Sequence, residues 1–434
     1  MSLIYSKLTT IINRIASEIR RSFIFSTIFS ILKFIEDQWV NSYFKSLYPS
    51  ENFLNNVNKN TIINKYIFSP LLILFVFAIF LILSLNRLTI SLTITIAVAF
   101  IFFFIGAVIL PRFFLNNVNE KVLVDFKDKD MYSIGFCLLL VSIIFFFISI
   151  ASVGGIPLLK PSIRYLLKPA FTMPVFLCIP AICILGSVYV NYYKNSKITR
   201  SQLRFRFLLL VVICCVFLLA LGYRTPLLAV ILIMIIIGYY GNVLSPWEVV
   251  IGALICVLAI IGIGYFRSLS ELQISSATSP FYTLQSRADF TLHVLDLLNF
   301  IGADFGVTKG SVIASSIPGS ELGPRMMIGK LISWRSEVTV TPTLIGQMVI
   351  DFGRVGVAFG MCVLGFILGI GFKIVKKTGN YFYIGLYGLL LTYAVLGVET
   401  GILDIQVLIY FLIAILIYIV YILKSSKTLG ENIG

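Results

Sequence analysis

The chain has 434 residues, of which 59% are hydrophobic and only 12% are charged, against roughly 25% charged residues in soluble domains. Its mean hydropathy is +1.00, and several apolar runs exceed the roughly 18 residues that mark a transmembrane helix, which excludes a soluble globular protein. The net charge of +15 could indicate nucleic-acid binding, but the positions of the Lys and Arg residues favour membrane topology. We therefore expect an all-α, polytopic integral membrane helical bundle without a nucleic-acid partner.

The N-terminal region, residues 1–67, contains no membrane span. Residues 22–35 are apolar but too few to cross a bilayer, and Ser22, Ser26, Ser30 and Lys33 recur along one side. An amphipathic helix of this kind lies along the membrane surface.

About ten membrane spans follow, because each remaining apolar run is long enough for a helix that crosses the bilayer. Seven fall within residues 68–265 and three within 342–424, which leaves a large loop at 266–341, expected to contain short helices, and a tail at 425–434. Lys and Arg are more frequent on the side of the N-terminus. By the positive-inside rule, both termini are expected in the cytoplasm and the loop outside the plasma membrane. The predicted spans are 68–86, 90–110, 133–153, 171–193, 206–222, 226–241, 247–265, 342–372, 381–398 and 402–423.

The sequence lacks the motifs of metal and nucleotide chemistry. All seven cysteines fall within predicted spans, and no Cys/His spacing suits a metal. There is no P-loop, no GxGxxG and no zincin motif. We expect no metal site and no cofactor, and any chemistry should occur on the outer face.

A first group of outward cations lies at Lys160, Arg164 and Lys168, between two prolines. If this short piece is helical, the four-residue spacing places the three cations on one face. They could bind an anion, or they could form an ordinary interfacial stripe at headgroup depth.

Arg224 lies in a tight turn, before Thr225 and Pro226, which predict a helix start. An arginine beside a helix N-terminus can bind an anion through its fixed charge and through free backbone N–H groups. The alternative is an arginine that only anchors the helix end at the interface. Arg267 directly follows the span 247–265 and is expected at a similar depth.

A third feature is a predicted amphipathic helix over residues 284–300 of the loop. Its polar face carries Asp289, His293 and Asp296, whereas Arg287 falls on the opposite side. An aspartate one turn from the chain's single histidine could orient it as a base. A surface salt bridge is the other interpretation.

The loop ends at Thr341 and Pro342, which predict a helix N-cap and first helical position. The helix is expected to run to residue 372. Asp351 and Arg354 would share one side of it, and glycines at 346, 353, 356 and 360 would allow close packing on the other. An acid and a base near the outer end of a membrane helix indicate a functional site or its support.

Together, Arg164, Arg224 and Arg267 predict a rim of arginines at headgroup level, with Glu399 and Asp404 at a similar depth. Such a rim suits an anionic headgroup attached to a lipid tail. A sugar linked to a polyprenyl diphosphate meets that description.

These motifs resemble the O-antigen polymerase family, the Wzy-type oligosaccharide repeat-unit polymerases. The resemblance covers roughly residues 68–424 and rests on four short motifs, Gly154-Gly155-Ile156-Pro157-Leu158-Leu159 with Arg164, Gly222-Tyr223-Arg224-Thr225-Pro226, Ile317-Pro318-Gly319, and Thr341-Pro342-Thr343-Leu344-Ile345-Gly346 followed by Asp351-Phe352-Gly353-Arg354-Val355-Gly356.

The resemblance implies a membrane glycosyltransferase that joins polyprenyl-diphosphate-linked oligosaccharides into a surface polysaccharide, without nucleotide or metal. Membrane lipids and other polysaccharide-assembly membrane proteins are the implied partners. Arg164, Arg224, Arg267 and Arg354 would bind the diphosphate, and Asp351, Asp289 or His293 would deprotonate the acceptor.

Three alternatives remain open. The related ligases carry a His-Asn pair where this chain has Pro342 and Thr343, a departure that favours a polymerase. A transporter or flippase of lipid-linked glycans would share the basic rim, but the internal repeats and paired broken helices common in transporters are not visible. A structural membrane protein would leave Arg224 and the Asp351/Arg354 pair unexplained.

Overall fold

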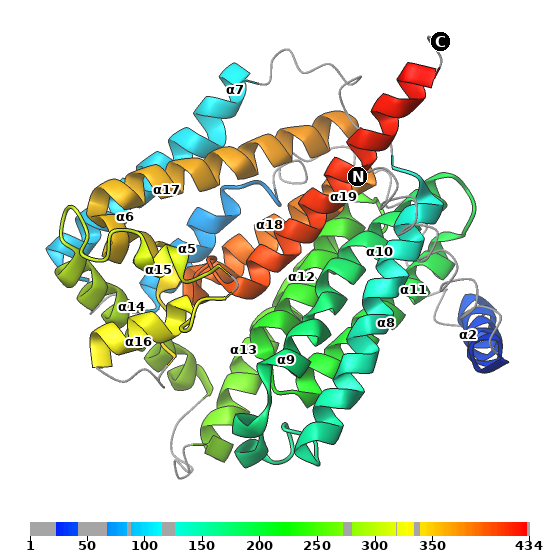
Figure 1. The fold of residues 1–434 in the computed structure, drawn as a ribbon, viewed down its shortest axis with the longest axis horizontal. Coiled ribbons are helices and arrows are strands. Elements are labelled where there is room, and N and C mark those ends of the chain that lie inside the picture. Colours follow the sequence, from blue (N-terminus) through cyan, green and yellow to red (C-terminus); the bar gives the residue numbers. More distant parts are fainter. Residues whose placement is uncertain are drawn as a thin grey trace.

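The computed structural model describes residues 23–41, 67–84, 88–114, 126–271, 280–317, 319–333 and 339–431. Within these ranges every regular element is a helix, so the predicted all-α fold is confirmed (Figure 1). The protein is a polytopic helical membrane protein.

Most helices of the bundle precede the large loop in the sequence. They are α2 (Phe23–Asn41), α5 (Leu72–Ile82), α6 (Ile90–Phe104), the π-helical turn η3 (Ile105–Ile109), α7 (Leu110–Phe114), α8 (Asp128–Val153), the 3₁₀ turn η5 (Pro161–Leu166), α9 (Pro169–Thr172), the 3₁₀ turn η6 (Met173–Leu177), α10 (Cys178–Lys194), α11 (Arg200–Ala220), α12 (Arg224–Tyr240) and α13 (Pro246–Glu271). The loop itself contains α14 (Pro280–Gly302), α15 (Ser311–Ala314) and α16 (Pro324–Ser333). The chain then continues with α17 (Thr343–Thr378), α18 (Tyr381–Thr400) and α19 (Ile405–Glu431).

The helices of the bundle coincide with the predicted spans. In the described part of the chain, 7 segments are long and apolar enough to cross a membrane, namely Ile90–Phe114, Asp128–Val153, Pro169–Lys194, Arg200–Ala220, Thr343–Thr378, Tyr381–Thr400 and Ile405–Ile422. Shorter apolar helices occupy the other predicted spans, at Leu72–Ile82, Arg224–Tyr240 and Pro246–Ala259.

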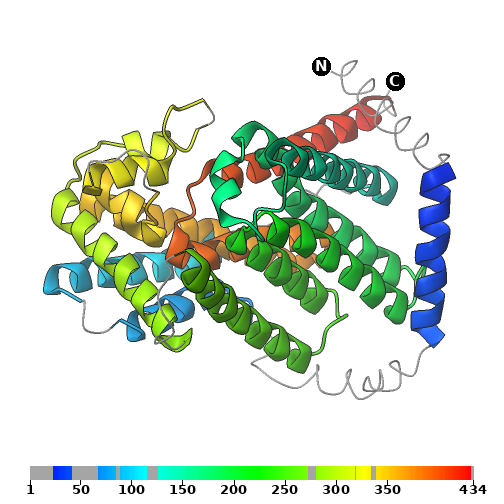
Figure 2. The ribbon, with the colours of Figure 1, turned by 90° about the horizontal axis from the view of Figure 1, so that it is seen from below.

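The bundle has two distinct ends. Helices α14, α15 and α16 gather at one of them, here called the loop end, and α2 lies across the other, here called the α2 end (Figure 2). Because neighbouring helices alternate in direction, α6, α12, α17 and α19 begin at the loop end and α18 ends there (Figure 1).

Helix α2 is attached to α11 by a polar and an aromatic contact. Arg206 Nε donates to Glu36 Oε1 at 3.2 Å, and the rings of Trp39 and Phe205 are 6.2 Å apart. Phe34 is 64% exposed on α2, so the helix keeps an apolar side uncovered, as an interfacial helix does.

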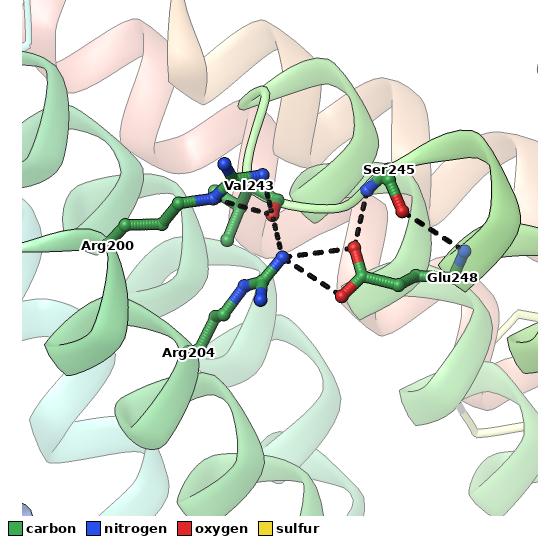
Figure 3. A network of polar contacts seen from close by, with 5 residues as sticks. All are labelled: Arg200, Arg204, Val243, Ser245 and Glu248. Carbon is green, nitrogen blue, oxygen red and sulfur yellow. Dashed lines mark hydrogen bonds and ion pairs between the residues drawn. The ribbon is translucent and has the colours of Figure 1, made fainter. Parts of the chain in front are cut away.

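At the α2 end, two arginines of α11 fix the turn between α12 and α13 (Figure 3). Arg200 Nη2 and Arg204 Nη2 both donate to the carbonyl oxygen of Val243, at 2.9 and 3.0 Å. Arg204 also pairs with Glu248 at 2.9 Å, and Glu248 accepts from the backbone N–H of Ser245 at 2.6 Å. The two guanidinium groups thereby satisfy the carbonyl of Val243, which lies in the turn after α12.

Two predicted helix starts are shifted. Helix α17 begins at Thr343, and its N-cap is Pro342, with no side-chain hydrogen bond to the helix. Thr343 has φ 62°, which lies outside the α-helical range, so the helix does not extend back through Pro342. Helix α12 begins at Arg224 with Tyr223 as its N-cap, so Thr225 lies within the first turn. The predicted threonine caps at 341 and 225 are therefore wrong.

Helix α17 is broken at Gly353, which the sequence reading missed. Gly353 has φ 62° and ψ −152°, a conformation that only glycine adopts readily. A Cβ there would overlap the backbone of Asp304, and a Cβ on Gly306 (φ 75°) would overlap the backbone of Asp351. The α14–α15 loop and the break thus meet backbone to backbone.

The same loop satisfies the carbonyl groups that the break leaves free. The N–H of Val307 donates to Ile350 O at 2.9 Å, and the N–H of Lys309 donates to Asp351 O at 3.1 Å. Because unpaired backbone groups are costly in a membrane protein, the loop is a required part of the helix.

The glycines of α17 pack differently from the prediction. A Cβ on Gly360 would meet Met348 of the same helix, since the break turns the first half of α17 back toward the second. Close packing against a neighbour instead uses Gly365, whose Cβ would lie 2.5 Å from Phe103 O, and Gly369, beside Ala107.

Substituting Gly353 tests the break. Gly353→Ala should lower the free energy of unfolding by about 2 kcal/mol or more, because alanine resists positive φ and its Cβ meets the loop backbone. The matched control is Gly262→Ala on α13, where no atom lies within 4 Å of an added Cβ. The thermal unfolding midpoint of the purified protein in detergent measures both. Equal midpoints for the two variants would contradict this account.

Candidate functional site

Asp351, a predicted catalytic base, is completely buried. Its Oδ1 accepts from the N–H of Val312 at 3.1 Å and from Thr308 Oγ1, and its Oδ2 accepts from the N–H of Ile313 at 2.7 Å. The carboxylate caps the start of α15 and is shielded from water. In this position Asp351 holds the α14–α15 segment on the broken helix.

Arg354 follows the break and points to a different set of partners from Asp351. Its Nη1 donates to Asp304 Oδ1 at 2.8 Å, its Nη2 donates to Ser91 Oγ at 2.8 Å, and its Nε donates to Thr95 Oγ1 at 3.2 Å. The prediction that Asp351 and Arg354 share one side of a continuous helix is wrong, because the break at Gly353 lies between them. Arg354 joins α17 to α6 and to the loop.

The polar face of α14 lies against the start of α6. Asp289 accepts from Ser84 Oγ, and Asp296 accepts from Thr89 Oγ1 at 2.6 Å, where Thr89 is the N-cap of α6. His293 is exposed, and no hydrogen bond or ion pair joins it to the described residues. The predicted helix is confirmed, and the structure places its two acids in contacts with α5 and α6.

The opposite face of α14 provides the principal cationic contact of the loop end. Arg224, at the start of α12, donates from Nη2 to Glu399 Oε1 at 3.1 Å. The Nε of Arg287, on α14, donates to the same oxygen. Arg224, Arg287 and Glu399 are called the arginine cluster below, and their side chains are 13%, 37% and 28% exposed.

Arg164 lies against the two residues that precede Arg224 in the chain, Gly222 and Tyr223. Its guanidinium carbon is 5.5 Å from the centre of the Tyr223 ring, and Tyr223 precedes Arg224 in the chain. Burial raises the pKa of Tyr223 above its ordinary value, while Arg164 opposes that rise, so the phenol stays neutral at physiological pH. Residues 161–166 form a 3₁₀ turn, so the predicted common helical face of Lys160, Arg164 and Lys168 is wrong.

A second ion pair at the loop end ties α16 to the start of α19. Arg325 Nη2 lies 3.1 Å from Asp404 Oδ2. Arg267 belongs to the last turns of α13, but its side chain lies outside the described residues. Among the described residues, no group of three or more His, Cys, Asp or Glu side chains could hold a metal ion.

The structure therefore brings Arg224 together with Arg287 and Glu399, and it places Arg164 against Tyr223, the residue before Arg224. Sequence reasoning missed Arg287 because it falls on the less polar side of α14, and it noted Glu399 only as a nearby acid. No local pattern signals their contact, because Arg287 and Glu399 are 112 positions apart in the sequence. Two guanidinium groups that share one carboxylate leave donors and a positive charge for an anion.

Comparison with known proteins supports a family assignment. Residues 66–411 match the family described as "Putative O-antigen polymerase". The chain belongs to this family. As an O-antigen polymerase family member, it is related to membrane proteins with glycosyltransferase-like activity on lipid-linked oligosaccharides, which confirms the resemblance seen in the sequence.

One relative is an uncharacterized protein of Methanocaldococcus jannaschii, 28% identical over 297 residues, which cover 68% of this chain and 78% of the relative. No solved structure matches the chain.

The role of Asp351 can be tested by removing one of its acceptor oxygens. Asp351→Asn should loosen the segment around α15, because an amide nitrogen cannot accept the N–H bonds that hold it. Proteolysis or hydrogen exchange within 306–317 should then become at least about tenfold faster, as expected for a loss of about 1.4 kcal/mol or more. Glu321→Gln, at an exposed carboxylate of the same large loop, is the control. Unchanged protection in Asp351→Asn would show that the three hydrogen bonds do not hold the segment.

Proposed function

We propose that this protein is an oligosaccharide repeat-unit polymerase that works at the loop end of its bundle. It transfers a glycan from a polyprenyl diphosphate to a hydroxyl of a second lipid-linked repeat unit, and it requires neither nucleotide nor metal. Family membership supports the reaction class. The observation that carries the proposal is the arginine cluster, in which Arg224 and Arg287 converge on one carboxylate oxygen.

The leaving group of the proposed reaction is the polyprenyl diphosphate. When the acceptor oxygen bonds to the sugar carbon, the bond from that carbon to the diphosphate oxygen breaks, and the electron pair departs with the diphosphate. Fixed guanidinium groups stabilise that developing charge without having to rearrange. Arg224, Arg287 and the adjacent Arg164 are the groups we assign to this task. Arg267 and Arg354 stay as further candidates, although Arg354 would first have to leave Asp304.

The loop end must face outward for this reaction to build a surface polysaccharide. We propose that both termini and α2 lie in the cytoplasm and that the membrane is the plasma membrane. The Lys and Arg of the α10–α11 turn, including Lys194, Lys197 and Arg200, support this orientation.

Reconstitution tests the reaction itself. The purified protein in lipid vesicles should lengthen lipid-linked oligosaccharide repeat units without ATP, without an ion gradient and in the presence of a chelator. A ligase would move the glycan to another acceptor without lengthening the repeat-unit polymer. A transporter would move the lipid-linked substrate across the vesicle membrane and leave its length unchanged. Either result would contradict the proposed polymerase.

Labelling tests the orientation. Single cysteines at Ser311 and Asn195 of a Cys-less variant lie at exposed positions of the loop end and of the α2 end. An impermeant thiol reagent added to intact cells should modify the cysteine at 311 and not the one at 195, and the pattern should reverse in inside-out vesicles. Modification of both from the same side would overturn the assigned topology.

Arginine geometry at position 224 gives a quantitative test. Lysine keeps the charge but loses the planar fork of donors, and a charge-assisted hydrogen bond contributes roughly 1.5–3 kcal/mol. Arg224→Lys should therefore slow polymerisation by about ten- to a hundredfold, and Arg224→Ala should slow it further.

Glycan chain length in cells at matched protein levels, together with turnover in vesicles, measures this effect. Arg112→Ala, at an exposed arginine on α7 far from the loop end, is the control and should polymerise normally. Full-length glycan from Arg224→Ala would remove Arg224 from the reaction.

A further inference from the structure

Glu399 has a position that no other described carboxylate shares. It lies in the last turn of α18, and its Oε1 accepts hydrogen bonds from both Arg224 of α12 and Arg287 of α14. Its side chain remains 28% exposed. Two arginines from separate helices therefore hold a single carboxylate oxygen that substrate could still reach.

We propose that Glu399 is the base that deprotonates the acceptor hydroxyl, and that diphosphate binding to Arg224 and Arg287 releases Glu399 for this role. The inference rests on the proposed function, because it concerns the same reaction. It assigns to Glu399 a part that family membership and the sequence motifs leave unassigned.

The release follows from competition for the same donors. A diphosphate carries more charge than a carboxylate and offers several acceptor oxygens, so it competes well for two guanidinium groups. In the empty site both guanidinium groups occupy Glu399 Oε1, so an acceptor hydroxyl cannot donate to that oxygen. Once the arginines turn to the diphosphate, the oxygen is free to accept the hydroxyl hydrogen. Binding of the lipid diphosphate donor thus frees Glu399 to act as the base, and Glu399 stays bound to both arginines while the site is empty.

Proximity separates Glu399 from the other acids. A general base must lie about 3 Å from the acceptor oxygen, and that oxygen must approach to about 3–3.5 Å of the sugar carbon attached to the diphosphate. The base therefore has to lie close to the arginines that bind the diphosphate. Glu399 contacts two of them directly.

The remaining candidates are engaged elsewhere. Asp351 is fully buried and bonded to the start of α15, and Asp289 contacts Ser84. Asp404 pairs with Arg325. His293 is exposed on the face of α14 opposite to Arg287, so it points away from the cluster.

The proposed reaction is a nucleophilic substitution at the sugar carbon, assisted by a general base. The acceptor O–H gives its proton to Glu399, and the acceptor oxygen forms the new bond to the sugar carbon. The bond between that carbon and the diphosphate oxygen breaks, and the leaving diphosphate keeps the electron pair beside Arg224 and Arg287. Solvent then takes the proton from Glu399.

The test compares Glu399→Gln with the wild-type protein in vesicles. Glutamine keeps the shape and can still meet an arginine, but it cannot take a proton. We expect kcat to fall by about 10²- to 10⁴-fold, the usual contribution of a general base, with KM little changed. Binding of undecaprenyl diphosphate should be unchanged or several-fold tighter, because the internal competitor for the arginines is weakened.

Two further variants make the result specific. Glu399→Asp keeps a carboxylate and should retain part of kcat. Glu36→Gln removes the carboxylate of another Glu–Arg pair, with Arg206 at the α2 end, and should leave turnover unchanged. A thermal unfolding midpoint for each variant shows whether the fold survives.

The outcomes separate the inference from the proposed function. A wild-type protein that does not lengthen the glycan rejects the proposed function and this role with it. If the wild type lengthens the glycan and Glu399→Gln keeps its kcat, only the role of Glu399 is rejected. If Glu399→Gln instead loses diphosphate binding, Glu399 is a structural clamp of the arginines and the inference is wrong.

Discussion

The carbonyl groups of Ile350 and Asp351 constrain the loop end more than any other groups. The break at Gly353 leaves them without helical partners, and the N–H groups of the α14–α15 loop supply the missing bonds at 2.9 and 3.1 Å. Because a bilayer offers no water to replace those bonds, loop and helix must form together. The positions of α14 and α15 follow from this requirement, and α14 carries Arg287.

The arginine cluster depends on that placement. Arg224 and Glu399 come from α12 and α18, which pack against each other in the bundle, whereas Arg287 reaches them only because α14 lies across the end of the bundle. Asp351 contributes from a distance, since its carboxylate holds the segment that follows α14. Asp351, which the sequence suggested as a catalyst, thus supports the loop structure. The positive charge that an anion would meet in the arginine cluster comes from two separate helices, α12 and α14.

Apolar composition made the spans predictable, because a membrane helix is marked by its own run of apolar residues. The helix at 284–300 was predictable from the periodic spacing of its polar residues. The break in α17 was not predictable, since glycine is common in membrane helices and the reason for this one is the opposing backbone of residues 304–306. For the same reason the shared side of Asp351 and Arg354 was predicted wrongly, because a straight helix would place both on one side and the break at Gly353 lies between them. The contact between Arg287 and Glu399 joins residues 112 positions apart, so no local pattern reveals it.

A structure of the protein in a lipid nanodisc with bound undecaprenyl diphosphate tests the central claim most directly. This account predicts the diphosphate within hydrogen-bond distance of Arg224 and Arg287, with Glu399 no longer bonded to either arginine and facing the space where an acceptor sugar would lie. A diphosphate bound elsewhere, with the contacts of Glu399 to Arg224 and Arg287 intact, would contradict it.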